Sequence, residues 1–159
     1  MKRMLLVAVL FAFRAFALDA NDINATNVVA RMNEYRAEAG LPPLRIDPSL
    51  TRAAEARMNE MAEGEWWAHE APDGTPPFAL IPIDYDYAFA GENLAAGFDT
   101  AGLLVQSWME SRGHRANILG PNYADCGIAI IEGSTKGPAM GKSIVVLFGR
   151  RKVQMVTAK

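Results

Sequence analysis

The chain has 159 residues, of which 50% are apolar and 21% are charged, a composition that is typical of one globular domain and excludes disordered, collagen-like and coiled-coil chains. Its 16 basic and 18 acidic residues give a net charge of −2, and no run of Lys and Arg follows the first residues, so we expect no nucleic-acid partner. A single cysteine, Cys126, excludes an internal disulfide and a cysteine-rich zinc module.

The first 17 residues have the pattern of a signal peptide. Lys2 and Arg3 precede an apolar run over residues 4–13, and Ala15-Phe16-Ala17 supplies a small-residue cleavage pattern. Because the run is shorter than the roughly 20 residues that span a bilayer, we expect cleavage after Ala17, a secreted or periplasmic location and no transmembrane segment in the mature chain. The alternative is a buried N-terminal helix of a cytosolic protein, which Arg14 favours.

Two helices are predicted after a short lead over residues 18–26. In the first, over residues 27–39, apolar residues recur at helical spacing, and Gly40 follows at the expected end. Residues 41–44 contain two prolines and should be extended. The second helix should begin after the N-cap Asp47 and end near Gly64, and its predicted buried stripe consists of Leu50, Ala54, Met58 and Met61.

The rest of the chain predicts a loop, a third helix and two strands. Residues 65–90 combine four prolines with six aromatic residues, which favours an ordered loop packed against the domain. Asp99 or Thr100 should cap a helix that ends before Gly113. The β-branched runs 126–131 and 143–148 predict an antiparallel hairpin. Because the helices precede these strands instead of alternating with them, an α+β fold is favoured.

Three separated residues offer the chemistry of metal ligands. His69 and His114 are the only histidines, and Glu92 lies between them, directly after Gly91, a residue that permits unusual backbone angles. Two imidazoles and a carboxylate suit zinc or a similar divalent ion if they converge. The alternative is that each histidine is a hydrogen-bonded structural residue. Cys126 lies in an apolar run, where a buried inert thiol is expected rather than a nucleophile.

A series of short motifs follows in a fixed order over residues 27–150. They are Asn33-Glu34-Tyr35-Arg36, Pro43-Leu44, His69 with Asp73-Gly74, Gly91-Glu92-Asn93-Leu94-Ala95, Trp108 and Gly113-His114-Arg115-Ala116-Asn117-Ile118-Leu119. In this order they closely resemble the CAP superfamily, also called the SCP-like extracellular domain, and above all its short bacterial members without disulfides. The resemblance implies an α-β-α sandwich with a central antiparallel sheet between helices, followed by a tail over residues 151–159.

The resemblance also implies a central cleft lined by two histidines and two acidic residues, which in some family members holds a divalent cation. His69, His114 and Glu92 match three of these four positions. The family's second glutamate stands three residues after the helix tryptophan, where this chain has Ser111. Glu110 is one position earlier, and one residue along a helix rotates a side chain by about 100°. Either Ser111 replaces the acid, or Glu110 reaches the cleft.

The leading hypothesis for the function, implied by the resemblance, is a secreted, monomeric binding domain. Its cleft is expected to hold a divalent cation, with zinc as a candidate, and a small apolar or cell-envelope ligand. One alternative is a metal-dependent hydrolase in which the ion activates water and Glu92 is the general base. A second is a structural extracellular module in which His69, Glu92 and His114 only hydrogen-bond one another. The sequence has no evident oxyanion donor or substrate-pocket motif, which favours a binding domain over an enzyme.

Overall fold

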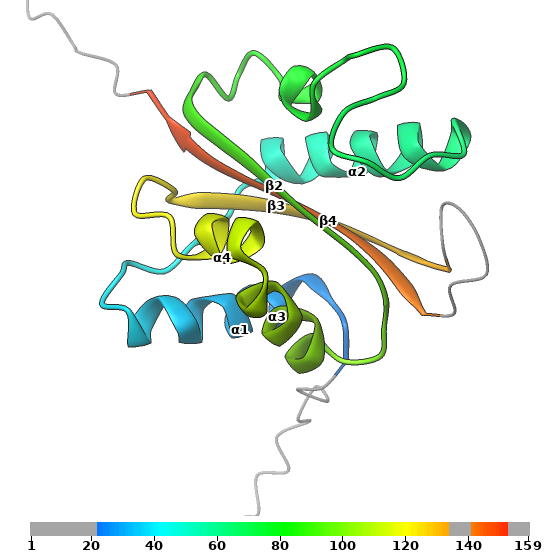
Figure 1. The fold of residues 1–159 in the computed structure, drawn as a ribbon. Coiled ribbons are helices and arrows are strands. Elements are labelled where there is room, and N and C mark those ends of the chain that lie inside the picture. Colours follow the sequence, from blue (N-terminus) through cyan, green and yellow to red (C-terminus); the bar gives the residue numbers. More distant parts are fainter. Residues whose placement is uncertain (1–21, 134–140, 153–159) are drawn as a thin grey trace, which may run out of the picture.

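The computed structural model describes residues 22–133 and 141–152. The predicted signal peptide, residues 18–21 of the predicted lead and residues 153–159 of the tail lie outside these residues. The described residues form three layers, in which helices cover both faces of one sheet (Figure 1). None of the helices in this part of the chain is long and apolar enough to cross a membrane.

The three predicted helices are confirmed, with small shifts at their ends. The helices of the described residues are α1 (Ala25–Glu38), α2 (Pro48–Glu63), α3 (Ala101–Glu110) and α4 (Arg112–Ile118). Side-chain oxygens of Asn24, Asp47 and Thr100 accept hydrogen bonds from the first amides of α1, α2 and α3, which fixes where each helix begins. Gly64 is the C-cap of α2, as predicted.

The fourth helix, α4, was not predicted, because the sequence pattern ended the helical region before Gly113. The backbone of Ser111 is extended, with φ −89° and ψ 123°, so this one residue ends α3 and begins α4. Gly113, which we expected beyond the end of the helical region, lies in the first turn of α4. A break of one residue changes the direction of the chain but hardly disturbs the spacing of apolar residues, so the sequence pattern does not reveal it.

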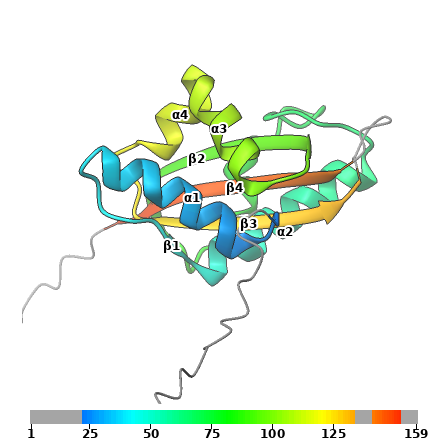
Figure 2. The same cartoon turned by 90° about the horizontal axis from the view of Figure 1, so that it is seen from below.

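The sheet has four strands in the order β1-β3-β4-β2. Their bounds are β1 (Arg45–Ile46), β2 (Tyr87–Phe98), β3 (Asp125–Glu132) and β4 (Lys142–Arg151). The predicted antiparallel hairpin is confirmed as β3 and β4, and β2 pairs antiparallel with β4. The two-residue β1 pairs parallel with β3, so the sheet is mixed at one edge. Figure 2 shows β2 at the opposite margin, beside α3 and α4.

Strand β2 was not predicted, and it extends back into the expected loop over residues 65–90. The stretch around Gly91 and Asn93 has low strand propensity, because glycine and asparagine are depleted in strands. Pairing with β4 supplies what local propensity does not: Glu92 lies opposite Leu147 and Asn93 opposite Val146. The remainder of the expected loop is irregular and includes a short 3₁₀ helix over Pro77–Leu80.

Alternating side chains of β4 build two hydrophobic cores, one on each face of the sheet. Ile144, Val146 and Phe148 pack with α1, α3 and α4, whereas Val145 and Leu147 pack with α2. The strand is therefore a continuous apolar run rather than an alternating one, as expected when both faces of a sheet are covered. This arrangement confirms the α+β class and the α-β-α sandwich.

Candidate functional site

Glu92 lies at the centre of the candidate site, on the edge strand β2. Successive side chains of a strand point to opposite faces, and here Glu92 points toward α2, where its side chain is only 1% exposed. Gly91 has an ordinary backbone angle, so its role differs from the one we expected. A Cβ atom at this position would lie 2.6 Å from the hydroxyl of Tyr123 and 2.8 Å from Oδ1 of Asn117, so glycine is needed for close approach.

His69 lies in the loop after α2 and is held by Glu92. Its Nδ1 lies 2.7 Å from Oε1 of Glu92. An ionised carboxylate only accepts hydrogen bonds, so with Glu92 ionised Nδ1 is the donor and Nε2 is the nitrogen left for another partner. The side chain of His69 is 58% exposed. Glu92 therefore presents this imidazole to solvent with a nitrogen available for a ligand.

Arg57 of α2 is a component of the site that the sequence reasoning missed. It is fully buried, and its Nε donates to Oε2 of Glu92 at 3.3 Å. Its Nη2 donates to the carbonyl of His69 at 2.7 Å, so one guanidinium fixes both partners of the His69–Glu92 contact. The guanidinium also lies over Trp66, 4.6 Å from the ring centroid. A signal was present, because Arg57 falls on the buried face of α2 between Ala54 and Met61.

His114 approaches the same place from α4, on the other face of the sheet. Its ring centroid lies 6.3 Å from that of His69 and 6.3 Å from that of Trp108. His69 follows α2 and His114 lies on α4, and these helices cover opposite faces, so the two imidazoles meet around the edge of the sheet that β2 forms.

Two asparagines position α4 against β2. Asn93 Nδ2 donates to the carbonyl of His114 at 3.2 Å. Asn117 Nδ2 donates to the carbonyl of Glu92 at 3.0 Å and to Oδ1 of Asn93 at 2.8 Å. Both asparagines belong to the motifs that carried the family resemblance, but the sequence did not reveal this role. They fix the distance between the strand that bears Glu92 and the helix that bears His114.

Burial controls the electrostatics of the site. It raises the pKa of Glu92, against the hydrogen bond from His69 and the positive charge of Arg57, which both lower it. Burial also lowers the pKa of His114, and the neighbouring His69 acts in the same direction. Neutral imidazole is the form that binds metals, so the surroundings of His114 favour its ligand form near neutral pH.

Glu110 and Ser111 do not join this group. The exposed Glu110 accepts a hydrogen bond from Nε2 of Gln106 at 3.2 Å, and it lines a surface depression with Phe98 and Leu103 on α3. Ser111 is half-buried at the joint between α3 and α4, and its side chain caps neither helix. The structure thus brings His69, Glu92 and His114 together, while the carboxylate of Glu110 is engaged elsewhere.

The donor set that the site offers to a cation consists of two imidazoles rather than a cage of three or four protein ligands. Over residues 22–133 and 141–152, no group of three or more His, Cys, Asp and Glu side chains is arranged to hold a metal ion. Two imidazoles on one tetrahedral ion, with metal–nitrogen distances of about 2.0–2.1 Å, have ring centroids about 5 Å apart. The centroids of His69 and His114 are 6.3 Å apart, so the two rings would have to approach each other by about 1 Å to share such an ion.

Comparison with known proteins agrees with the motif order. The model of the CAP family, described as the cysteine-rich secretory protein family, matches residues 29–147. The uncharacterized protein YkwD of Bacillus subtilis (strain 168) is 38% identical over 106 residues, which are 66% of this chain and 41% of that protein. The uncharacterized membrane protein YlbC of the same organism is 27% identical over 99 residues, 62% of this chain and 29% of that protein. The chain thus spans less than half the length of these relatives.

Solved structures share the fold. An outer surface protein from Borrelia burgdorferi has a TM-score of 0.68 and 25% identity, over 80% of this chain and 92% of that one. An extracellular protein containing a SCP domain from Bacillus anthracis str. Ames has a TM-score of 0.66 and 22% identity, over 79% and 40%. A cysteine-rich secretory protein from Staphylococcus aureus subsp. aureus Mu50 has a TM-score of 0.62 and 21% identity, over 79% and 38%.

Proposed function

Because the chain belongs to the cysteine-rich secretory protein (CAP) family, we propose that it is an exported binding domain whose His69–His114 pair holds a divalent cation, with Zn²⁺ as the first candidate. The observation that carries this proposal is that the imidazole rings of His69 and His114 lie close together, with 6.3 Å between their centroids. One is oriented by Glu92 through Nδ1, and the other is kept neutral by burial. Neutral, oriented imidazoles are the nitrogen ligands that zinc prefers.

Glu92 has an orienting role in this proposal rather than that of a ligand. Both of its oxygens are engaged, one by His69 and one by Arg57. A carboxylate behind a metal-binding histidine fixes the tautomer of the ring and raises its basicity. His69 and His114 would hold the cation, and water or an oxygen of a ligand would complete its coordination. A bound divalent cation supplies a positive centre that attracts and polarises such an oxygen.

We further propose that the exposed side of His69 faces the ligand, a small apolar or cell-envelope component. The hydrolase alternative needs Glu92 as a general base within reach of a substrate or its water. Glu92 is 1% exposed and is engaged at both oxygens, so it is poorly placed for that role. The geometry therefore favours binding over hydrolysis.

Calorimetric titration with ZnCl₂ at pH 7.5 tests the cation. We expect His69→Ala and His114→Ala each to weaken binding at least about tenfold, the usual cost of losing one ligand or its support. Glu92→Gln should weaken binding less than either histidine variant, because the ring loses its orienting charge but keeps a ligand nitrogen. Glu110→Gln is the matched control, since this exposed acid lies on another face of α3. If the parent and His114→Ala bind Zn²⁺ with equal affinity, the cation proposal is contradicted. The structural extracellular module then remains as the hypothesis.

Export is proposed from the N-terminal pattern, with cleavage after Ala17. The names of similar structures support it, because they describe an outer surface protein, an extracellular protein and a secretory protein. Intact-mass measurement of the protein recovered outside the cytoplasm should give a chain that begins at Leu18. A product that keeps Met1 and stays in the cytosol would contradict this part of the proposal.

A further inference from the structure

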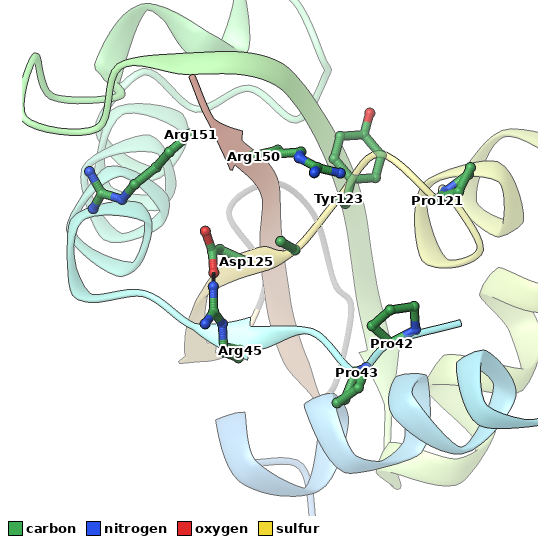
Figure 3. Close-up of a pocket in the computed structure, with 9 residues that line it drawn as sticks. Pro42, Pro43, Arg45, Pro121, Tyr123, Asp125, Arg150 and Arg151 are labelled. Atoms are coloured by element: carbon green, nitrogen blue, oxygen red, sulfur yellow. Dashed lines mark hydrogen bonds and ion pairs between the residues drawn. The ribbon is translucent and has the colours of Figure 1, made fainter. Parts of the chain in front are cut away.

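A concave site lies at one end of the sheet, and no histidine is among the described residues that line it. It has a volume of about 570 Å³, and we call it the arginine groove. Figure 3 shows the side chains that line it, which include Pro42, Pro43, Arg45, Pro121, Tyr123 and Arg150. None of the lining residues is His69, Glu92 or His114, so the groove is distinct from the candidate cation site.

A buried arginine holds the walls of the groove in place. Arg36 of α1 is fully buried, although it lies on the apolar stripe of that helix. Its guanidinium donates to the carbonyls of Pro42 at 2.8 Å, Gly120 at 3.0 Å and Tyr123 at 3.0 Å. These carbonyls belong to the two loops that face each other across the groove. The groove is therefore preformed, which lowers the entropic cost of binding a ligand.

The groove carries more positive than negative charge. Arg45 pairs with Asp125 at 3.1 Å, and Arg151 pairs with Asp47 at 2.9 Å. Arg150 has neither an ion pair nor a side-chain hydrogen bond within the part of the chain that the structure describes. The charge of Arg36, behind the walls, is met only by carbonyl oxygens there. In a chain whose net charge is −2, this local excess of guanidinium groups creates a field that attracts anions.

The rest of the lining is apolar and rigid. The apolar walls consist of the pyrrolidine rings of Pro42, Pro43 and Pro121 and the aromatic ring of Tyr123. The hydroxyl of Tyr123 donates a hydrogen bond to the carbonyl of Ala90 at 3.1 Å. Arg150 extends toward Tyr123 (Figure 3). Within the described residues, Arg150 is thus a guanidinium without an ion pair among apolar walls. Such a groove matches a ligand that carries one anionic group on an apolar body. A polyanion would find several of the arginines already neutralised.

We propose that the arginine groove binds a monoanionic ligand, a carboxylate or a phosphate diester on a small aromatic or apolar body, with Arg150 as the residue that binds the anion. The planar fork of a guanidinium matches either anion through two parallel hydrogen bonds. Tyr123 and the prolines then cover the apolar body. The chemistry of this site does not depend on the cation at His69 and His114.

Ligand titration of the full-length protein, followed by nuclear magnetic resonance, tests the proposal. The probes are two monoanions, phenylacetate and the phosphate diester methyl phenyl phosphate, with the neutral phenylacetamide as the control ligand. We expect the anionic probes to shift the Arg150 side-chain Nε–H signal and the Tyr123 amide signal, and the amide to bind at least about tenfold more weakly. Whichever anion binds more tightly identifies the source chemistry, carboxylate or phosphate.

Four variants test whether the guanidinium of Arg150, rather than positive charge in general, binds the anion. Arg150→Gln should weaken binding about tenfold or more, and Arg150→Lys should restore only part of the loss, because ammonium keeps the charge without the fork. Arg31→Gln removes the same charge from an exposed site on α1 and should bind like the parent. His114→Ala should also bind like the parent. Equal affinity of Arg150→Gln and Arg31→Gln, or equal affinity for phenylacetamide and phenylacetate, would overturn the proposal.

Discussion

Arg57 and Glu92 form an ion pair that is sealed from solvent, with 3.3 Å between Nε and Oε2 and side-chain exposures of 0% and 1%. A buried ion pair contributes little net stability, because desolvation of both charges offsets their attraction. Removing one partner is different, since the other charge then remains buried without compensation. This pair therefore links the stability of the sandwich to the orientation of His69.

The first prediction concerns that linkage. Arg57→Met should lower the free energy of unfolding at pH 7 by about 3–5 kcal/mol, because it leaves the buried carboxylate of Glu92 without its guanidinium partner and with only the contact to His69. Combining it with Glu92→Leu should recover part of the loss. Urea denaturation measures both changes. Arg52→Met is the control, since Arg52 is exposed on the same helix and should change stability by no more than about 0.5 kcal/mol. Equal losses for Arg57→Met and Arg52→Met would contradict a buried pair.

The same variant should change the pH dependence of stability. Burial raises the pKa of Glu92, and Arg57 opposes that rise, so Arg57→Met should raise the pKa further. A carboxyl whose folded pKa lies above its unfolded value of about 4.3 binds its proton more tightly in the native state. Protonation of Glu92 as the pH falls therefore stabilises the folded protein relative to the unfolded chain. Denaturation at pH 5 and pH 7 should show that the destabilisation by Arg57→Met is smaller at pH 5.

Cation binding should also depend on pH. Protons compete with metal for imidazole nitrogens, so affinity for Zn²⁺ should fall as the pH drops below the ordinary histidine pKa of about 6.5. Burial lowers the pKa of His114, so this ring stays available at a lower pH than an ordinary histidine. Calorimetry from pH 5 to pH 8 on the parent and His69→Ala measures the effect. A parent affinity that does not change over this range would argue against histidine ligands.

Local signals predicted most of the helices and the central hairpin. Asp47 and Gly64 mark the ends of α2 through backbone hydrogen bonding, which involves only neighbouring residues. The apolar runs of β3 and β4 follow from burial on both faces. Strand β2 and helix α4 depend on long-range context: β2 is ordered by pairing with β4, and α4 is separated from α3 only by the extended backbone of Ser111.

The candidate site was predictable in its residue types but not in its organisation. His69, Glu92 and His114 follow from motif order, and the structure brings them together. The part of Arg57 was missed because arginine is usually solvated, and sequence periodicity alone does not say which oxygen a buried guanidinium meets. Its position on the buried face of α2, like that of Arg36 on α1, was the available signal. A charged residue in an apolar stripe thus predicts a buried network in this fold.

The N-cap of α2 gives a further prediction. Asp47 accepts hydrogen bonds from the amides of Ser49 and Leu50 and pairs with Arg151 at 2.9 Å. Asp47→Ala should lower the free energy of unfolding by about 1–2 kcal/mol, the usual cost of losing such a cap. Asp47→Asn should cost less, because it keeps the capping oxygen and loses only the pairing with Arg151. Urea denaturation at pH 7 compares the three proteins, and equal stability of Asp47→Ala and the parent would contradict the cap.

The contribution of Asp47 should disappear in acid. Burial alone would raise its pKa, but the hydrogen bonds from Arg151, Leu50 and Ser49 outweigh burial and hold the pKa below its ordinary value. A carboxyl with a lowered folded pKa stabilises the protein above its unfolded pKa of about 3.9, and this stability is lost as the pH falls through the folded pKa. The difference between the parent and Asp47→Ala should therefore be constant from pH 7 to pH 5 and shrink below about pH 4.

The last prediction concerns Cys126, which the sequence indicated as an inert thiol. It is fully buried on β3, and burial, aided by the charge of Asp125, raises its pKa to about 12. Since only the thiolate reacts, and an ordinary thiol has a pKa near 8.5, native protein at pH 8 should react with iodoacetamide roughly a thousandfold more slowly than unfolded protein. Mass spectrometry of the labelled chain with and without urea measures this ratio. Rapid labelling of Cys126 without urea, while circular dichroism still shows a folded domain, would contradict the burial of this strand.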